Sequence, residues 1–255
     1  MNSKERNPKP APFDLMAALR VSEVIGEWPD EAREQLAALA QVQRHPRGAL
    51  LHRRGYPETR FFAIAGGAVE CCRVLPDGRY HVLPYLPAGR VFGLAAVLAN
   101  HPHLFDVRTR TDSTLVCFDG SEMRQFLLAR PELLISVAAS LSRRFVSLYE
   151  QLEDVSNKSL RQRLARVVLQ LAHSFGHPCR AGLEVSLRVA QDDLAAMAAA
   201  SRQRVNVEFG AMVAEGVLSA HYGRITVHDI PRLEEIAGRT MAAPGSKPGE
   251  TDWPW

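Results

Sequence analysis

The sequence predicts an α+β fold in which a β-rich region is followed by a long helix and then by two short helices and a β hairpin. Three observations support this prediction. Short apolar runs separated by glycine turns fill residues 49–118, apolar residues recur at heptad spacing from 134 to 155, and helical patterns precede a hairpin pattern within 189–229. Regularly spaced short strands are typical of a compact barrel or jelly roll.

The composition is typical of a globular protein. Of the 255 residues, 46% are hydrophobic and 23% are charged. No apolar run approaches the ~20 residues that span a bilayer, and the polar first 12 residues contain no signal core. We therefore expect a cytoplasmic protein without a membrane partner. The net charge of +3 permits nucleic-acid binding but does not establish it.

The N-terminal half is predicted to contain a flexible arm, residues 1–20, and a jelly-roll-like β-roll, residues 21–125. Within the second segment, Pro29 to Val42 has the apolar spacing of a short amphipathic helix. Beyond Ala49 we expect strands, among them the apolar runs Phe61–Ile64 and Val82–Leu86.

Residues 126–158 are predicted to form a long helix and a hinge. Pro131 suits the first turn of this helix, and apolar residues then follow a 4-3 heptad pattern at Leu134, Ala138, Leu141, Phe145, Leu148, Leu152 and Val155. Such a stripe packs either on its own β domain or on a second copy of the chain. The strict spacing favours a homodimer through residues 131–156, with Ser156–Ser159 as a hinge.

Residues 159–240 predict a winged helix-turn-helix. A first helix begins at Gln191, Ala199-Ala200 forms a tight turn, and Ser201 caps a second helix from Arg202 to Glu215. Its expected buried stripe is Val205, Phe209, Met212 and Val213. A hairpin follows to about residue 227, which completes the helix, turn, helix and wing order. The remaining segment, 241–255, is expected to be a disordered tail.

The start of the second helix carries the residues that read DNA in this fold. Such a helix lies in the major groove, where Arg pairs with guanine and Gln or Asn pairs with adenine. Double-stranded DNA is therefore the predicted partner. The candidate contacts are Ser201, Arg202, Gln203, Arg204, Asn206, Gln191, Arg188 and Arg224.

Three segments resemble motifs of the CRP/FNR family of bacterial transcription regulators, and the resemblance covers residues 25–235. The segments are Phe62-Ala63-Ile64-Ala65-Gly66-Gly67-Ala68-Val69, Leu86-Pro87-Ala88-Gly89-Arg90-Val91-Phe92-Gly93 and Ser201-Arg202-Gln203-Arg204-Val205. The resemblance implies a homodimeric, sequence-specific DNA-binding regulator that is not an enzyme. It also implies a cyclic-nucleotide-binding-like sensor in the β-roll, a palindromic site and RNA polymerase as a partner.

The resemblance places an effector pocket at Phe92, Gly93, Leu94, His103, Leu104, Arg108, Leu148 and Tyr149. Cyclic-nucleotide-binding members carry Glu where this chain has Leu94, and an Arg for the phosphate where it has His103 or Leu104. An anionic phosphate buried without a strong cation is costly. Cyclic AMP is therefore disfavoured, no cofactor is predicted, and the effector is an unknown ligand, a cyclic dinucleotide or none. Arg108 is interpreted as an exposed strand residue.

Two alternatives come from other classes of protein. His101, His103 and Asp106 faintly match a cupin metal site of an enzyme, although Pro102 disturbs the strand alternation that such a site needs. We interpret these histidines as surface-loop residues and predict no metal site. The second alternative is a sensor-like module that regulates a protein partner without binding DNA. The polar cluster from Ser201 to Asn206 argues against it.

Overall fold

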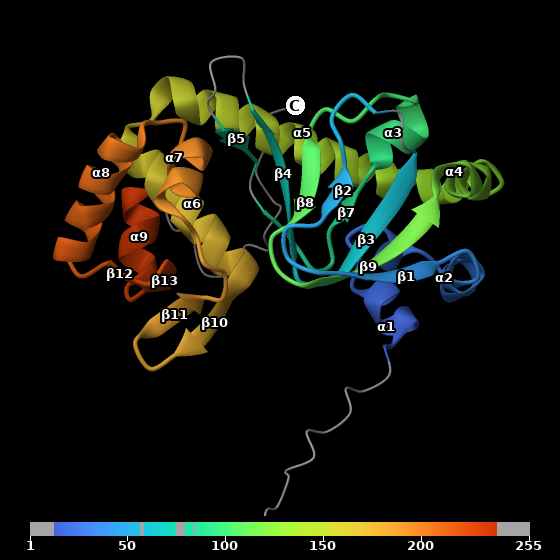
Figure 1. The fold of residues 1–255 in the computed structure, drawn as a ribbon, viewed down its shortest axis with the longest axis horizontal. Helices are drawn as coiled ribbons and strands as arrows, with labels where there is room; N and C mark the ends of the chain where they lie inside the picture. Colours follow the sequence, from blue (N-terminus) through green and yellow to red (C-terminus); the bar gives the residue numbers. More distant parts are fainter. Residues whose placement is uncertain (1–12, 57–58, 75–79, 84, 239–255) are drawn as a thin grey trace, which may run out of the picture. The chain divides into compact units, whose positions relative to one another are not determined.

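The computed structural model describes residues 13–56, 59–74, 80–83 and 85–238 (Figure 1). It confirms the α+β class, with a β-sheet sandwich, a long helix and a C-terminal helix-turn-helix with a small sheet. The described residues fall into two compact units, one within 13–69, 86–104 and 108–141, the other within 70–85, 105–107 and 142–238. This division runs through the long helix, so the predicted domain boundaries stay predictions.

In the described part of the N-terminal half, two short helices precede a run of seven short strands, β1 to β7. In chain order the elements are α1 (Leu15–Arg20), the 3-10 turn η1 (Ile25–Glu27), α2 (Asp30–Ala37), β1 (Gln41–His45), β2 (Leu50–His52), β3 (Arg60–Gly66), β4 (Ala68–Val74), β5 (Tyr80–Val82), β6 (Leu86–Pro87), β7 (Val91–Phe92), α3 (Leu94–Ala99), β8 (Asp106–Thr109), β9 (Ser113–Asp119) and α4 (Gly120–Leu128).

The C-terminal half is mostly helical. Its elements are the 3-10 turn η2 (Pro131–Leu133), α5 (Leu134–Asn157), α6 (Leu160–Phe175), β10 (Gly176–Cys179), β11 (Gly182–Val185), α7 (Gln191–Met197), α8 (Arg202–Ala214), β12 (Leu218–His221), β13 (Arg224–Val227) and α9 (Ile230–Ile236).

Three sheets hold the strands together. The first has the order β1-β9-β3-β7, and its antiparallel register places Phe61 opposite Phe118 and Phe62 opposite Phe92. The second has the order β2-β8-β4-β5, with β6 paired to β4. The third has the order β10-β11-β13-β12 and lies in the second unit.

The core of the first unit joins its sheet to the start of α5. Phe61 and Phe118 are buried together with Trp28 and Val137. The indole Nε1 of Trp28 donates a hydrogen bond to Ser136 Oγ at 2.6 Å, which satisfies both polar groups inside the core. The first turns of α5 are therefore anchored to this core.

Gly93 joins β7 to α3 in a conformation that requires glycine. Its φ is +95°, and a Cβ there would lie 2.2 Å from the carbonyl oxygen of Arg60. A side chain at this position would clash with backbone that has no room to move.

Three predictions for the N-terminal half are wrong in part. Residues 13–20 are not an arm, because Asp14 caps α1 and Leu19 is fully buried in the core. The helix predicted to Val42 ends at Ala37, since strand pairing of Val42 with Val116 prevails over helical spacing. The run Val82–Leu86 is not one strand, because β5 ends at Val82 and β6 starts at Leu86. The first 12 residues and the tail 241–255 lie outside the described residues.

The second unit follows the predicted winged helix-turn-helix closely. Helices α7 and α8, the cap at Ser201 and the hairpin of β12 and β13 all form where the sequence predicts them. Val205, Phe209 and Met212 are buried as expected, whereas Val213 is 39% exposed and does not belong to the buried stripe. The β10–β11 hairpin was not predicted, because its residues (Gly176–Val185) include glycine, proline and charged positions that lack strand alternation.

Candidate nucleic-acid interface

The N-terminus of α8 presents a polar face. Ser201 has extended backbone angles, and its Oγ accepts a hydrogen bond from the backbone N–H of Arg204 at 3.5 Å. Residues 201–204 and Asn206 are all exposed, whereas Val205 beneath them is fully buried. The buried stripe therefore fixes the helix and leaves the predicted base-reading side chains in solvent.

Two contacts bring the start of α7, the start of α8 and the tip of the wing to one edge of the second unit. Arg202 Nη1 lies 3.2 Å from Asp192 Oδ2 in the first turn of α7. The backbone N–H of Val189, which precedes α7, donates to the carbonyl of Gly223 in the β12–β13 turn at 2.8 Å. The predicted contacts Arg188, Gln191 and Arg224 are exposed on the segments that these contacts connect.

The arginines at this edge are held by weak ion pairs. The Arg202 and Asp192 side chains are 60% and 66% exposed, and Arg224 Nη1 lies 3.0 Å from Glu184 Oε1 with Arg224 49% exposed. Exposed pairs of this kind contribute ~0–1 kcal/mol. Each guanidinium can therefore exchange its carboxylate for a base edge or a phosphate at small cost.

Helix α5 has a second apolar face that the described chain leaves uncovered. Its Val137 and Ser140 are buried, but the heptad residues further along are not. Phe145 and Leu152 are each 69% exposed, Leu148 is 51% exposed and Val155 is 54% exposed. Contiguous exposed apolar surface of this kind marks a site of protein association.

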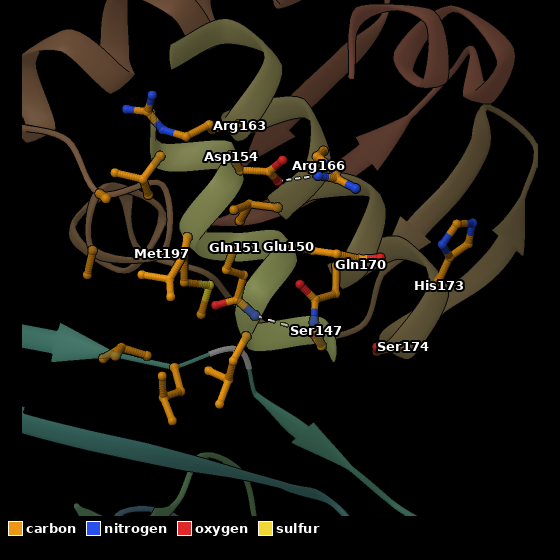
Figure 2. A pocket seen from close by; sticks show the side chains of 18 residues that line it. Ser147, Glu150, Gln151, Asp154, Arg163, Arg166, Gln170, His173, Ser174 and Met197 are labelled. Carbon is orange, nitrogen blue, oxygen red and sulfur yellow. Dashed lines mark hydrogen bonds and ion pairs between the residues drawn. The ribbon is translucent and has the colours of Figure 1, made fainter. Parts of the chain in front are cut away.

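A pocket of about 460 Å³ lies within the second unit, beside the junction of α5 and α6 (Figure 2). Asp154 is paired with Arg166 of α6 and, at 3.2 Å, with Lys158. Gln170 and His173 of α6 and Met197 of α7 also line the pocket. This ionic cluster fastens α6 to the end of α5 across the predicted hinge, Ser156–Ser159.

Two of the predicted effector residues meet around a histidine that the sequence analysis did not identify. His52 of β2 is buried; its ring stacks on His103 with centroids 3.7 Å apart and meets Phe92 edge-on at 5.6 Å. His103 lies in a loop as predicted, but it is partly buried against an aromatic cluster, so its interpretation as a surface residue is wrong. A single histidine within a short strand gave no signal for this contact.

The structure places the other predicted effector residues in different surroundings. Leu94 fills the core of the first unit, and Leu104 is 57% exposed. Arg108 is a strand residue as predicted, in β8, but it is partly buried and not exposed. Leu148 and Tyr149 (63% exposed) lie on the part of α5 that belongs to the second unit, where Leu148 lines the pocket described above.

Burial of His52 makes a prediction about acid stability. Desolvation, together with the charges of His103 and Arg60, lowers the pKa of His52 to about 3 from 6.5. Between pH 6.5 and 3, the unfolded chain therefore binds more protons than the folded chain. The contribution of His52 to the free energy of unfolding is complete above pH 6.5 and is lost as the pH falls through that range. We expect His52→Phe to remove it, so that urea unfolding shows a smaller loss of free energy from pH 7 to pH 5 than in the wild type.

Below pH 6.5, the free energy of unfolding of the wild type should fall with pH more steeply than that of His52→Phe. For one such group, the difference between the two slopes reaches at most about 1.4 kcal/mol per pH unit. Both proteins share all other titrating groups, so the wild type serves as the matched reference. A difference in unfolding free energy that is the same at pH 7 and pH 5 would contradict the neutral, buried state of His52.

The described residues give no support to a metal site or a membrane span. No three His, Cys, Asp or Glu side chains among them are grouped so that they would hold a metal ion, and this includes His101, His103 and Asp106. Within the same part of the chain, no helix combines the length and apolar character needed to cross a bilayer.

Comparison with known proteins covers both halves of the chain. Residues 42–130 match the model of the cyclic nucleotide-binding domain, and residues 162–236 match the Crp-like helix-turn-helix domain. A CRP-like cAMP-activated global transcriptional regulator of Mycobacterium tuberculosis is 28% identical over 75% of this chain and 86% of its own length. A global nitrogen regulator of Nostoc sp. is 25% identical over 73% of this chain and 85% of its own length.

A solved structure supports the same fold. A CRP-family transcriptional regulator of Thermus thermophilus superposes with a TM-score of 0.67 at 24% identity, over 79% of this chain and 99% of that one. The family is not enzymatic, and its members are dimeric, effector-responsive regulators, so the cupin-like alternative and the module that does not bind DNA are both wrong. The chain belongs to the CRP/FNR family of DNA-binding transcription regulators.

Proposed function

We propose that the chain is a homodimeric, cytoplasmic regulator that reads a palindromic DNA site with α8 and does not use cyclic AMP as its effector. The observation that carries the proposal is the edge where the polar N-terminus of α8, the first turn of α7 and the wing tip come together. A helix N-terminus exposed in this way docks in the major groove, with the wing beside it on the backbone. RNA polymerase is the proposed protein partner of the DNA-bound dimer.

The residues of α8 favour a particular base pattern. Arg202 presents a guanidinium fork that matches the two acceptors of guanine, and Gln203 presents an amide that matches adenine. Ser201 caps the helix, and the exposed N–H groups of the first turn suit a phosphate oxygen. Arg188 and Arg224 are proposed as phosphate contacts.

The exposed stripe of α5 supports the dimer. Its apolar residues repeat at heptad spacing, and only the first two turns of α5 are used by the core of the first unit. A second copy of α5 buries the stripe as a coiled coil. Two copies then present two α8 helices, which is why the proposed site is palindromic.

The chemistry of the sensor residues argues against cyclic AMP. Leu94, Leu104 and Leu148 provide no charge for a phosphate or hydrogen bond for a ribose, and Leu94 is buried in the core. We propose an effector of another kind, with a cyclic dinucleotide or regulation without a ligand as the alternatives. The cluster of Asp154, Lys158 and Arg166 is the proposed link through which α5 positions the DNA-binding domain.

Selection of DNA from a random pool tests the proposal directly. Purified ligand-free protein at fixed salt is expected to enrich a palindrome whose half-sites contain a G beside an A. Parallel selections with cyclic AMP and with a cyclic dinucleotide show whether either changes the enrichment. Failure to enrich any sequence under all three conditions would contradict sequence-specific binding, and enrichment only with cyclic AMP would contradict the proposed effector chemistry.

A further inference from the structure

The tip of the wing carries a tyrosine in an unfavourable position. Strands β12 and β13 pair from Leu218–Val227 to His221–Arg224, so the turn consists of Tyr222 and Gly223 alone. Both residues have positive φ, +50° and +79°, which is the type I′ turn of tight hairpins. Glycine suits this conformation, whereas a bulky residue in it is uncommon and strained.

The side chain of Tyr222 is not packed against the rest of the fold. It is 94% exposed, more than any other large apolar side chain in the described residues. Asparagine, aspartate or glycine would form the same turn without the strain or the exposed ring. Strain and exposure that the fold does not need are a reason to infer function.

The turn is held at the edge that faces DNA in the proposed function, on which this inference rests. The hydrogen bond from Val189 N–H to the Gly223 carbonyl fixes the turn beside the segment before α7. An added Cβ at Gly223 would lie 3.8 Å from Arg188 Cβ, so Arg188 is next to the turn. Arg202 reaches the same edge through its 3.2 Å contact with Asp192. Arg188 beside the turn and Arg224 directly after it are thus the cationic side chains next to Tyr222, and both are proposed phosphate contacts.

We propose that Tyr222 is a contact to the DNA backbone, with its hydroxyl donating to a phosphate and its ring packing on the adjoining deoxyribose. Such a contact positions the protein and carries no sequence information. Because the side chain is neutral, its loss does not change the number of counterions released on binding.

Tyr222→Asn separates a DNA contact from a structural role, because the two predict opposite changes. Asparagine accepts the left-handed conformation, so the thermal midpoint is expected to stay the same or rise. Affinity for the selected palindrome and for unrelated duplex of equal length is expected to fall alike, by about tenfold, with an unchanged slope of affinity against salt. Tyr222→Phe keeps the ring and lacks only the hydroxyl. Its loss of affinity is expected to be about a third of the loss in Tyr222→Asn, on a logarithmic scale.

Arg188→Ala is the matched comparison at the same edge, since loss of a cation lowers the salt slope by about one. Unchanged DNA affinity in Tyr222→Asn, while the wild type binds DNA, would overturn this inference alone. The same holds if DNA affinity is unchanged but recruitment of RNA polymerase is lost, since the wing would then serve a protein partner. A wild type that binds no DNA overturns the proposed function and this inference with it.

Discussion

Replacement of Arg202 and Gln203 by alanine is expected to abolish recognition of the palindrome. Both side chains are exposed at the start of α8, and neither is part of its buried stripe. Each bidentate contact to a base is worth ~1–3 kcal/mol, so the double variant should lose about 30-fold to 10⁴-fold in affinity for the selected site. Affinity for unrelated DNA should fall far less, which electrophoretic or fluorescence titration at fixed salt will measure.

Gln203→Glu gives a sharper test of the same contact. A carboxylate accepts from the N4 amine of cytosine, whereas the amide of glutamine pairs with adenine. Selection with this variant should therefore replace adenine by cytosine at one position of each half-site. Arg232→Ala is the matched control, because Arg232 is an exposed arginine of the same unit on α9 and pairs only with Glu235 in the contacts described. An unchanged consensus with Gln203→Glu would contradict the proposed docking of α8.

The double variant Phe145→Glu and Leu152→Glu is expected to be a monomer with little affinity for the palindrome. Both positions are 69% exposed in the single chain, so the changes remove no core contact of the monomer. Four buried carboxylates, two from each copy, would prevent the coiled coil. Loss of the second DNA-binding domain removes the gain from bivalency, so affinity should fall by about 100-fold or more.

Sedimentation and circular dichroism check this prediction together. Gln151→Glu is the control, because it introduces a carboxylate within α5 at a position outside the heptad stripe. The control should remain dimeric, and both proteins should keep their helix content. A dimer that persists in the Phe145→Glu and Leu152→Glu variant would show that the chain associates through another surface.

The sequence predicted the second unit better than the first for a physical reason. Helices α7 and α8 depend on local signals, namely the cap at Ser201, the acidic first turn and the spacing of Val205 and Phe209. The first unit depends on pairings between distant residues, such as Val42 with Val116, which local periodicity does not encode.

The same contrast holds for the candidate sites. Exposed polar residues at a helix start follow from the helix itself, so all eight predicted DNA contacts are on the surface. The stacking of His52 on His103 joins residues that are 51 positions apart in the sequence, and no sequence motif predicts this contact. Tyr222 was visible in the sequence only as the residue before Gly223. Its significance depends on a turn of two residues, which the register of β12 and β13 defines.

Because the heptad residues of α5 are covered only in the proposed dimer, DNA binding should depend on the concentration of the protein in the cell. The first two turns of α5 are buried within each chain, at Ser136, Val137 and Ser140, whereas the heptad residues from Leu141 to Val155 are exposed in the single chain and are buried only when two chains meet. Under the proposed dimer, the thermal midpoint should therefore rise with protein concentration. When the concentration is below the dimer dissociation constant, occupancy of a palindrome grows with its square. A modest change in synthesis or degradation of the chain would then produce a larger change in transcription of its target genes.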